Sequence, residues 1–140
     1  MSGDYEVDAR AFWTGGLAVA AIAGIAAVVT QLVLQLIFDT TLTEAGGAEL
    51  EYWKTFGVAF VAIVVGLAVL HLFLTAVPRG KTLWQLLASL VLIASLIPIT
   101  QLDSGGENGL HLLFLHLITY LFAVPTIVGM LPRVATPVQR

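Results

Sequence analysis

The sequence contains no cysteine. That absence excludes disulfide bonds, thiolate metal sites, thioether attachment of haem and thiol redox chemistry. Charged residues are also scarce, at 11% of the 140 residues, whereas a soluble domain typically has about 25%. Because so few charges cannot cover a surface that faces water, we expect lipid to be the main solvent around this chain.

The few charges are separated by four long runs that contain no Asp, Glu, Lys or Arg. These runs are Leu17–Phe38, Phe56–Val77, Leu83–Ile99 and Leu110–Leu131. A transmembrane helix needs roughly 20 apolar residues, with about 17 as a lower limit. The strict alternation of a membrane barrel strand is missing, and backbone groups in lipid must be hydrogen-bonded within their own segment. We therefore predict one all-α domain over residues 1–140, with four transmembrane helices running up-down-up-down over approximately 12–38, 53–77, 82–101 and 109–131. Pro132 is expected to end the fourth helix.

The basic residues predict the orientation, because loops on the cytoplasmic side of a membrane carry an excess of Lys and Arg. Five of the six basic residues fall on the side that holds both termini, namely Arg10, Arg79, Lys81, Arg133 and Arg140. Only Lys54 falls on the other side. We therefore predict a multi-pass protein of the cell membrane with both termini in the cytoplasm. The acidic start MSGDYEVDAR is not typical of a cleavable signal peptide, and we expect none.

Small residues in the first span are spaced for close helix packing. The stripe consists of Gly16, Ala20, Gly24, Ala27, Gln31 and Gln35, at steps of three or four residues. Small side chains at this spacing let two helix backbones approach each other closely in lipid. A weaker stripe in the second span consists of Gly57, Ala62 and Gly66. Trp13, Trp53 and Trp84 lie near the ends of spans, where tryptophan typically anchors a helix at the interface.

Polar side chains on three different spans fall at a similar depth. At a rise of ~1.5 Å per residue, Gln31, Ser95 and His116 each lie roughly 10 Å below the predicted outer boundary. Gln35 lies above Gln31 on the same stripe, and Tyr120 lies one turn below His116. We predict a polar cluster of these five residues around His116. Its ordinary role would be hydrogen bonding between helices, and the alternative is a site for a ligand.

The other two histidines are expected in different places. His111 is expected at the outer interface beside Asp103 and Glu107, where water reaches it. His71 is expected near the cytoplasmic end, too far from His116 for the two rings to hold one haem iron. Binding of a haem through a single histidine ligand is an alternative that this arrangement still allows. The segment 103–108 is more simply a solvated turn than a metal site.

The sequence lacks the residues needed for several other kinds of chemistry. No carboxylate lies inside a span beside a histidine, so neither a Ser/His/Asp set nor the buried carboxylate common in proton-coupled transporters is present. The sequence has no phosphate loop and no basic patch for nucleic acid. We therefore expect no catalytic residue, no metal site, no bound cofactor and no nucleic-acid partner.

Two segments of the second half, SLIPITQLD (95–103) and LLFLHLITYLFAVPTIVGMLP (112–132), resemble an uncharacterised family of small four-helix membrane proteins of bacteria and archaea. The resemblance rests on a Ser-x-x-Pro element at the end of the third span and a lone histidine early in the fourth, followed by a proline. Ser95, Pro98, His116 and Pro125 occupy those positions here. The resemblance implies a four-helix membrane fold and no particular activity.

These observations predict a small polytopic membrane protein without catalytic activity. Its partners are expected to be the lipid bilayer and, through helix packing, either a second copy of itself or a larger membrane complex. The alternatives are an outer-leaflet site around His116 for a lipophile or cofactor such as a quinone or haem, and transport of a small solute.

Overall fold

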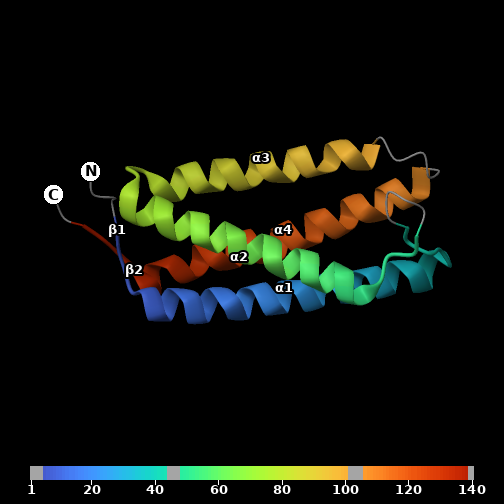
Figure 1. Cartoon of the computed structure of the whole chain (residues 1–140), viewed down its shortest axis with the longest axis horizontal. Helices are drawn as coiled ribbons and strands as arrows, with labels where there is room; N and C mark the ends of the chain where they lie inside the picture. Colours follow the sequence, from blue (N-terminus) through green and yellow to red (C-terminus); the bar gives the residue numbers. More distant parts are fainter. Residues whose placement is uncertain (1–4, 44–47, 101–105, 139–140) are drawn as a thin grey trace.

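The computed structural model describes residues 5–43, 48–100 and 106–138, with the backbone alone at 98–100, 106 and 107. The helices are α1 (Ala9–Phe38), α2 (Tyr52–Ala76), α3 (Gly80–Thr100) and α4 (Gly106–Val134). Short strands β1 (Tyr5–Val7) and β2 (Ala135–Pro137) flank them. Consecutive helices run in opposite directions along one long axis (Figure 1). The predicted all-α four-helix bundle is therefore confirmed.

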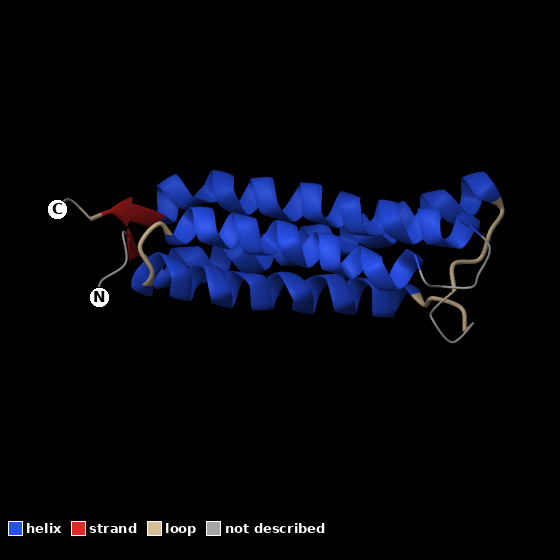
Figure 2. Ribbon diagram, turned by 90° about the horizontal axis from the view of Figure 1, so that it is seen from above, coloured by secondary structure: helices blue, strands red, loops and turns tan. Residues whose placement is uncertain are grey.

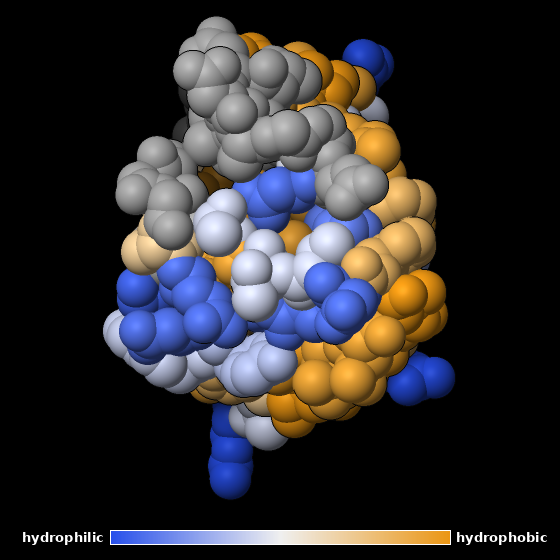
Figure 3. All heavy atoms as spheres, turned by 90° about the vertical axis from the view of Figure 1, so that its right-hand side faces the viewer, coloured by the Kyte–Doolittle hydropathy of each residue, from blue (hydrophilic) through white to orange (hydrophobic). Residues whose placement is uncertain are grey.

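All four helices are long and apolar enough to cross a membrane by length and composition. Large apolar side chains cover the outside of the bundle, as at Leu36, Val58, Leu90 and Leu121, which are each more than half exposed. Hydrophilic residues gather at the end that carries the α1–α2 connection, while hydrophobic residues cover the sides (Figure 3). This distribution indicates a multi-pass membrane protein, because an apolar exterior of this extent is stable only in lipid.

Two helix boundaries differ from the sequence-based expectation. Helix α1 begins at Ala9 rather than near residue 12, because the Asp8 carboxylate accepts a hydrogen bond of 3.0 Å from the Ala11 backbone N–H. Such a cap satisfies one of the unpaired donors in the first turn of a helix. Helix α4 continues through Pro132 to Val134. A proline removes only one backbone hydrogen bond, so the last turn persists around it.

The two ends of the chain meet in a small sheet that the sequence did not predict. Strands β1 and β2 are antiparallel, with Tyr5 opposite Pro137 and Val7 opposite Ala135. The Asp8 N–H extends the pairing by donating to the Val134 carbonyl at 2.9 Å. Figure 2 shows the sheet at one end of the helices. We call this the terminal end and the other the opposite end. Three-residue strands are too short for a recognisable periodicity.

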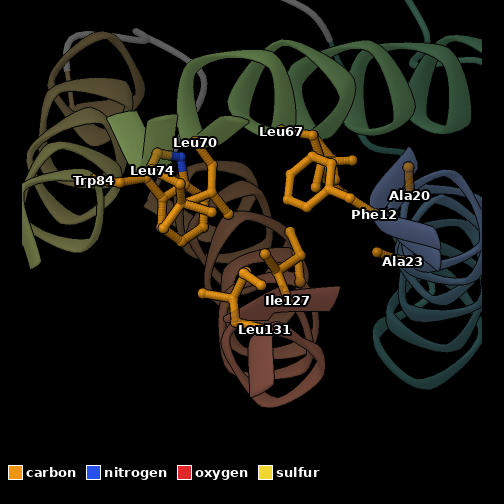
Figure 4. Packing of buried hydrophobic residues seen from close by; sticks show 12 residues of the cluster. Phe12, Ala20, Ala23, Leu67, Leu70, Leu74, Trp84, Ile127 and Leu131 are labelled. Carbon is orange, nitrogen blue, oxygen red and sulfur yellow. The ribbon is translucent and has the colours of Figure 1, made fainter. Parts of the chain in front are cut away.

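The main hydrophobic core lies toward the terminal end. Its buried members are Phe12, Ala20, Ala23, Ile63, Leu67, Leu70, Leu74, Trp84, Ala123, Ile127, Leu131 and Ala135. All four helices contribute to it, and Figure 4 shows Trp84 of α3 pointing toward Leu70 and Leu74 of α2. Trp84 is only 4% exposed, and its Nε1–H donates to the Gly66 carbonyl at 2.8 Å. The expectation of an interfacial anchor is therefore wrong for Trp84, because its indole finds a carbonyl on α2. Trp53 is 68% exposed.

The small-residue stripe of α1 faces its neighbours as predicted. Its first five members, from Gly16 to Gln31, are buried. A Cβ added at Gly16 would lie 2.7 Å from Leu67 Cδ1, and one at Gly24 would lie 2.8 Å from Phe56 Cδ2. These distances show that α1 and α2 approach as closely as glycine allows.

The weaker stripe of α2 behaves differently. Nothing lies within 4 Å of a Cβ added at Gly57 or Gly66. These glycines therefore mediate no close helix approach, and the prediction of a second packing ridge is wrong for them. The physical reason for Gly66 is that it borders an unfilled space between α2 and α3 rather than a packed side chain.

We expect Gly24→Leu to destabilise the bundle by about 1–3 kcal/mol, the usual cost of overpacking a tight contact. The leucine would collide with the Phe56 ring and approach its carbonyl. Gly129→Leu is the matched control, because a Cβ there meets nothing within 4 Å. The free energy of unfolding in mixed micelles measures the stability of both variants. Equal loss of stability in the two variants would contradict the assignment of the α1 stripe to the α1–α2 contact.

Candidate functional site

A cavity of about 460 Å³ lies between α2, α3 and α4. Most of its wall is apolar, with side chains such as Val58, Val65 and Val69 from α2, and Leu87 and Val91 from α3. The polar residues on its wall are Lys54, Thr55, Trp84, His116, Thr119 and Tyr120. The cavity is therefore an apolar chamber with a small polar section, which is typical of sites for small lipophilic molecules.

The sequence explains why the space is open. Small residues recur along the three walls and at the α1 side, namely Ala27, Ala59, Ala62, Gly66, Ala88 and Ala123. Helices α2 and α4 both pack along α1, whereas α3 contacts them less extensively. In the part of α3 whose side chains are described, only Gly80 and Trp84 are buried. Small side chains facing a loosely packed helix leave the space between them unfilled.

His116 lies on the α4 wall of this cavity. Its Nδ1 is 2.8 Å from the carbonyl oxygen of Leu112, one turn earlier in the same helix. A carbonyl oxygen can only accept, so Nδ1 carries the hydrogen. In the neutral ring Nε2 is then an acceptor, and it has no partner in the part of the chain that the structure describes.

Tyr120 lies one turn from His116 and lines the same cavity. Its hydroxyl is 2.7 Å from Ser89 Oγ on α3. Ser89 Oγ also lies 2.9 Å from the Gln85 carbonyl, to which it must be the donor. Since a serine hydroxyl has one hydrogen, Tyr120 donates to Ser89. This bond links α3 to α4 beside the cavity.

Gln31 is fully buried and joins α1 to the start of α2. Its Nε2 donates to the Leu50 carbonyl at 2.6 Å, and its Oε1 accepts from the Thr55 hydroxyl at 2.6 Å. Gln31 therefore faces the protein rather than lipid. Gln35, half-buried one turn on, accepts from the Tyr52 hydroxyl at 2.6 Å.

The connection from α1 to α2 folds over the opposite end of the bundle. Leu42 is fully buried there, and its carbonyl accepts from the Leu50 N–H at 2.7 Å. The Asn108 side chain at the start of α4 accepts from the Thr43 N–H and donates to the Thr43 carbonyl and hydroxyl. Together with Gln31, these bonds hold Leu50 at the cavity, which it lines.

The five residues of the predicted polar cluster do not form one hydrogen-bonded group. His116 and Tyr120 share the cavity wall, whereas Gln31 bonds to Leu50 and Thr55 as described above. Ser95 donates to the Leu92 carbonyl of its own helix at 2.7 Å and does not line the cavity. Equal depth did not bring these groups together, because helix rotation decides which way a side chain points.

His111 is buried rather than water-accessible, with 6% of its surface exposed. Its ring packs on Phe38 with the centroids 4.8 Å apart, and its Nδ1 has no hydrogen-bond partner among the described residues. The expectation of a wet interface is wrong here because the end of α1 covers the ring. Its expected neighbour Asp103 lies outside the described residues, as does the side chain of Glu107.

His71 lies toward the terminal end, against the aromatic rings of Phe12 and Trp13, with centroids 5.3 and 6.2 Å away. It does not line the cavity. Within residues 5–43, 48–100 and 106–138 no group of three His, Asp or Glu side chains is arranged to hold a metal ion.

Sequence reasoning missed several residues of the cavity wall. Thr119, Thr55 and Lys54 line the cavity, and no sequence motif singled them out. Alanines on three facing helices were the available signal. Alanine is common in any membrane helix, so this signal is visible only once the helices are placed.

We expect Gln31→Leu to destabilise the protein by about 1–3 kcal/mol, because the Leu50 carbonyl and the Thr55 hydroxyl would lose a buried partner. Gln35→Leu is the control one turn away, and it should change stability by less than about 0.5 kcal/mol, since its partner Tyr52 is exposed. Unfolding in micelles measures both variants. A Gln31→Leu protein as stable as the control would contradict this role for Gln31.

Comparison with known proteins gives a family and no function. No curated protein and no solved structure matches the chain. A family described as a family of unknown function, DUF6069, matches residues 7–133. The match spans all four helices and nearly the whole chain, in agreement with the expected resemblance to an uncharacterised family. The chain therefore belongs to the DUF6069 family.

Proposed function

We propose that this membrane protein binds a lipophilic molecule from the bilayer in the cavity between α2, α3 and α4. The observation that carries the proposal is the cavity itself, with about 460 Å³ of space and an apolar wall. Ligand sites typically measure about 300–1,000 Å³ and combine apolar walls with a few polar groups. The proposal needs no catalytic residue in the protein.

The position of the cavity supports direct entry from lipid. Four of its lining residues are also exposed on the outside of the bundle, namely Val58, Val65, Leu87 and Val91. They lie on α2 and α3, so the cavity opens sideways between these two helices. A lipophile can then move from the bilayer into the cavity without meeting water.

We also propose a non-catalytic accessory role through packing of α3 against another membrane helix. Leu86, Leu90 and Ile93 on this helix are each more than half exposed. The partner would be a second copy or a larger membrane complex. This role and ligand binding are compatible, because the exposed face of α3 and the cavity are on different sides of that helix.

We infer that the protein resides in the cell membrane with both termini in the cytoplasm. The support is the distribution of basic residues along the chain. Arg10, Arg79, Lys81 and Arg133 lie at or beside the terminal end, whereas Lys54 lies near the opposite end. Basic residues collect on the cytoplasmic side of membrane proteins.

We expect Ala88→Phe to lower retention of a bound lipophile at least about tenfold, equivalent to ~1.4 kcal/mol of binding free energy. The added ring would occupy the cavity, since Ala88 is half-buried on its wall. Ala94→Phe is the matched control, an exposed alanine of the same helix that does not line the cavity. Native mass spectrometry measures both the mass of the retained molecule and the number of protein copies.

An unliganded wild-type mass after mild extraction, or equal retention in the two variants, would contradict lipophile binding. A dimer or a larger complex in the same spectra would support the accessory role of α3. A strictly monomeric protein without a partner would contradict it.

We expect a membrane-impermeant maleimide to label Thr41→Cys in intact cells and to label Thr82→Cys only after permeabilisation. Both positions are exposed and lie at opposite ends of the bundle. The natural chain has no cysteine, so each variant carries a single reactive thiol. The reverse labelling pattern would contradict the inferred orientation.

A further inference from the structure

We propose that the ligand of this cavity carries a hydroxyl group, as a lipophilic alcohol or phenol, and donates it to His116 Nε2. The inference rests on the proposed function and specifies the chemical class of the ligand. It follows from the direction of the hydrogen on each polar side chain of the cavity wall, because the hydrogen bonds of these side chains fix that direction.

The two threonines on the wall have no hydrogen left for a ligand. Thr119 donates its single hydroxyl hydrogen to the Leu115 carbonyl at 2.8 Å. The Gln31 amide is oriented by its bond to the Leu50 carbonyl, so its oxygen faces Thr55 and Thr55 is the donor. Each threonine therefore presents only oxygen lone pairs to a bound molecule.

The ring side chains on the wall likewise have no free hydrogen, and Trp84 offers no lone pair either. Trp84 donates its only N–H to the Gly66 carbonyl. Tyr120 donates to Ser89, because the Ser89 hydrogen is taken by Gln85. His116 directs its Nδ1 hydrogen to the Leu112 carbonyl, which leaves a lone pair on Nε2 in the neutral ring. Apart from Trp84, the polar section between α2, α3 and α4 is therefore a set of acceptors.

Lys54 is the exception, because an ammonium group has three donors and no acceptor. It lies at the first turn of α2, near the opposite end of the bundle. Its side chain also stacks on the Trp53 ring, with Nζ 5.8 Å from the centroid. Along the bundle, Lys54 thus lies nearer the opposite end than the acceptors of α4 do.

Because the polar side chains of α4 on the cavity wall are hydrogen-bond acceptors, the cavity favours ligands that carry a hydrogen-bond donor. A ketone, ester or quinone offers only lone pairs, so at His116 it would place acceptor against acceptor and leave both unpaired. A hydroxyl supplies the missing hydrogen. Leaving a buried polar group unpaired costs about 1–3 kcal/mol, more than one hydrogen bond usually contributes.

Among these acceptors, His116 Nε2 is the best placed. It has no partner in the described part of the chain, while the Thr119 and Thr55 oxygens already form short bonds. Tyr120, one turn away on the same wall, provides a second acceptor for a diol or a phenol with two hydroxyls.

The apolar remainder of the cavity is long. Lys54 and Val69 both line it, and they are about 22 Å apart along α2 at ~1.5 Å per residue. That length exceeds one leaflet, which is half of the ~30 Å hydrocarbon core. The alcohol or phenol therefore carries an extended chain and is not a compact ring system alone.

The test compares hexadecanol with hexadecyl methyl ether, which keeps the chain and the oxygen but lacks the donor hydrogen. The protein has three histidines, so ¹⁵N-histidine labelling gives a small set of signals, and His116→Phe assigns the relevant one. We expect His116 of the free protein to be protonated at Nδ1. Hexadecanol should shift the Nε2 signal, and the ether should leave it unchanged.

The affinities provide a second measurement. His116→Phe should weaken hexadecanol binding about five- to tenfold, the effect of one neutral hydrogen bond, and leave binding of the ether within about twofold. His71→Phe is the matched control, since His71 does not line the cavity; it should affect neither probe.

Three outcomes would overturn the inference. Equal binding of alcohol and ether, with or without His116, removes the donor requirement and leaves lipophile binding intact. An Nε2-protonated His116 in the free protein also removes it. Binding of neither probe to the wild-type protein, together with an unliganded native mass, overturns the inference and the proposed function together.

Discussion

Inside an apolar bundle in lipid, every backbone N–H and carbonyl must find its hydrogen-bond partner within the protein, and this requirement shapes the whole structure. The helices satisfy their own backbones, and the embedded hydroxyls donate to carbonyls one turn earlier, as Thr30, Thr119 and Thr126 do. Gln31 uses both ends of its amide to join α1, α2 and their connection. The same requirement orients His116, so that the polar side chains of α4 offer only acceptors to the cavity.

Packing divides the bundle into a tight part and a loose part. Helix α1 presents small residues, so the backbones of α1 and α2 come together as closely as Gly16 and Gly24 permit. Helix α3 is attached through packing of Trp84 in the main core and through two polar contacts, Trp84 to Gly66 and Ser89 to Tyr120. Directional contacts of this kind hold a helix at a set distance without filling the space behind it. The cavity is the result, and the proposed ligand would complete the packing there.

Composition and the spacing of residues along the sequence predict much of this arrangement. The length of the apolar runs predicts the four helices, and the α1 stripe predicts its buried face. His116 and Tyr120 line the same cavity. Equal depth also predicts Ser95 beside them, and this is wrong, since depth carries no information on helix rotation. His111 and Trp84 were assigned to the interface from position alone. Both are buried because a neighbouring helix covers them.

The sequence by itself determined that this chain forms four membrane-spanning helices, because uncharged apolar runs of that length have no other stable conformation in lipid. Only the tertiary structure decided which polar groups meet. Most embedded hydroxyls donate within their own helix, but the rotation and spacing of the helices decided which groups meet across helices, as Gln31 with Thr55 and Tyr120 with Ser89 do. That arrangement created the cavity between α2, α3 and α4, where Nε2 of His116 has no partner in the described part of the chain.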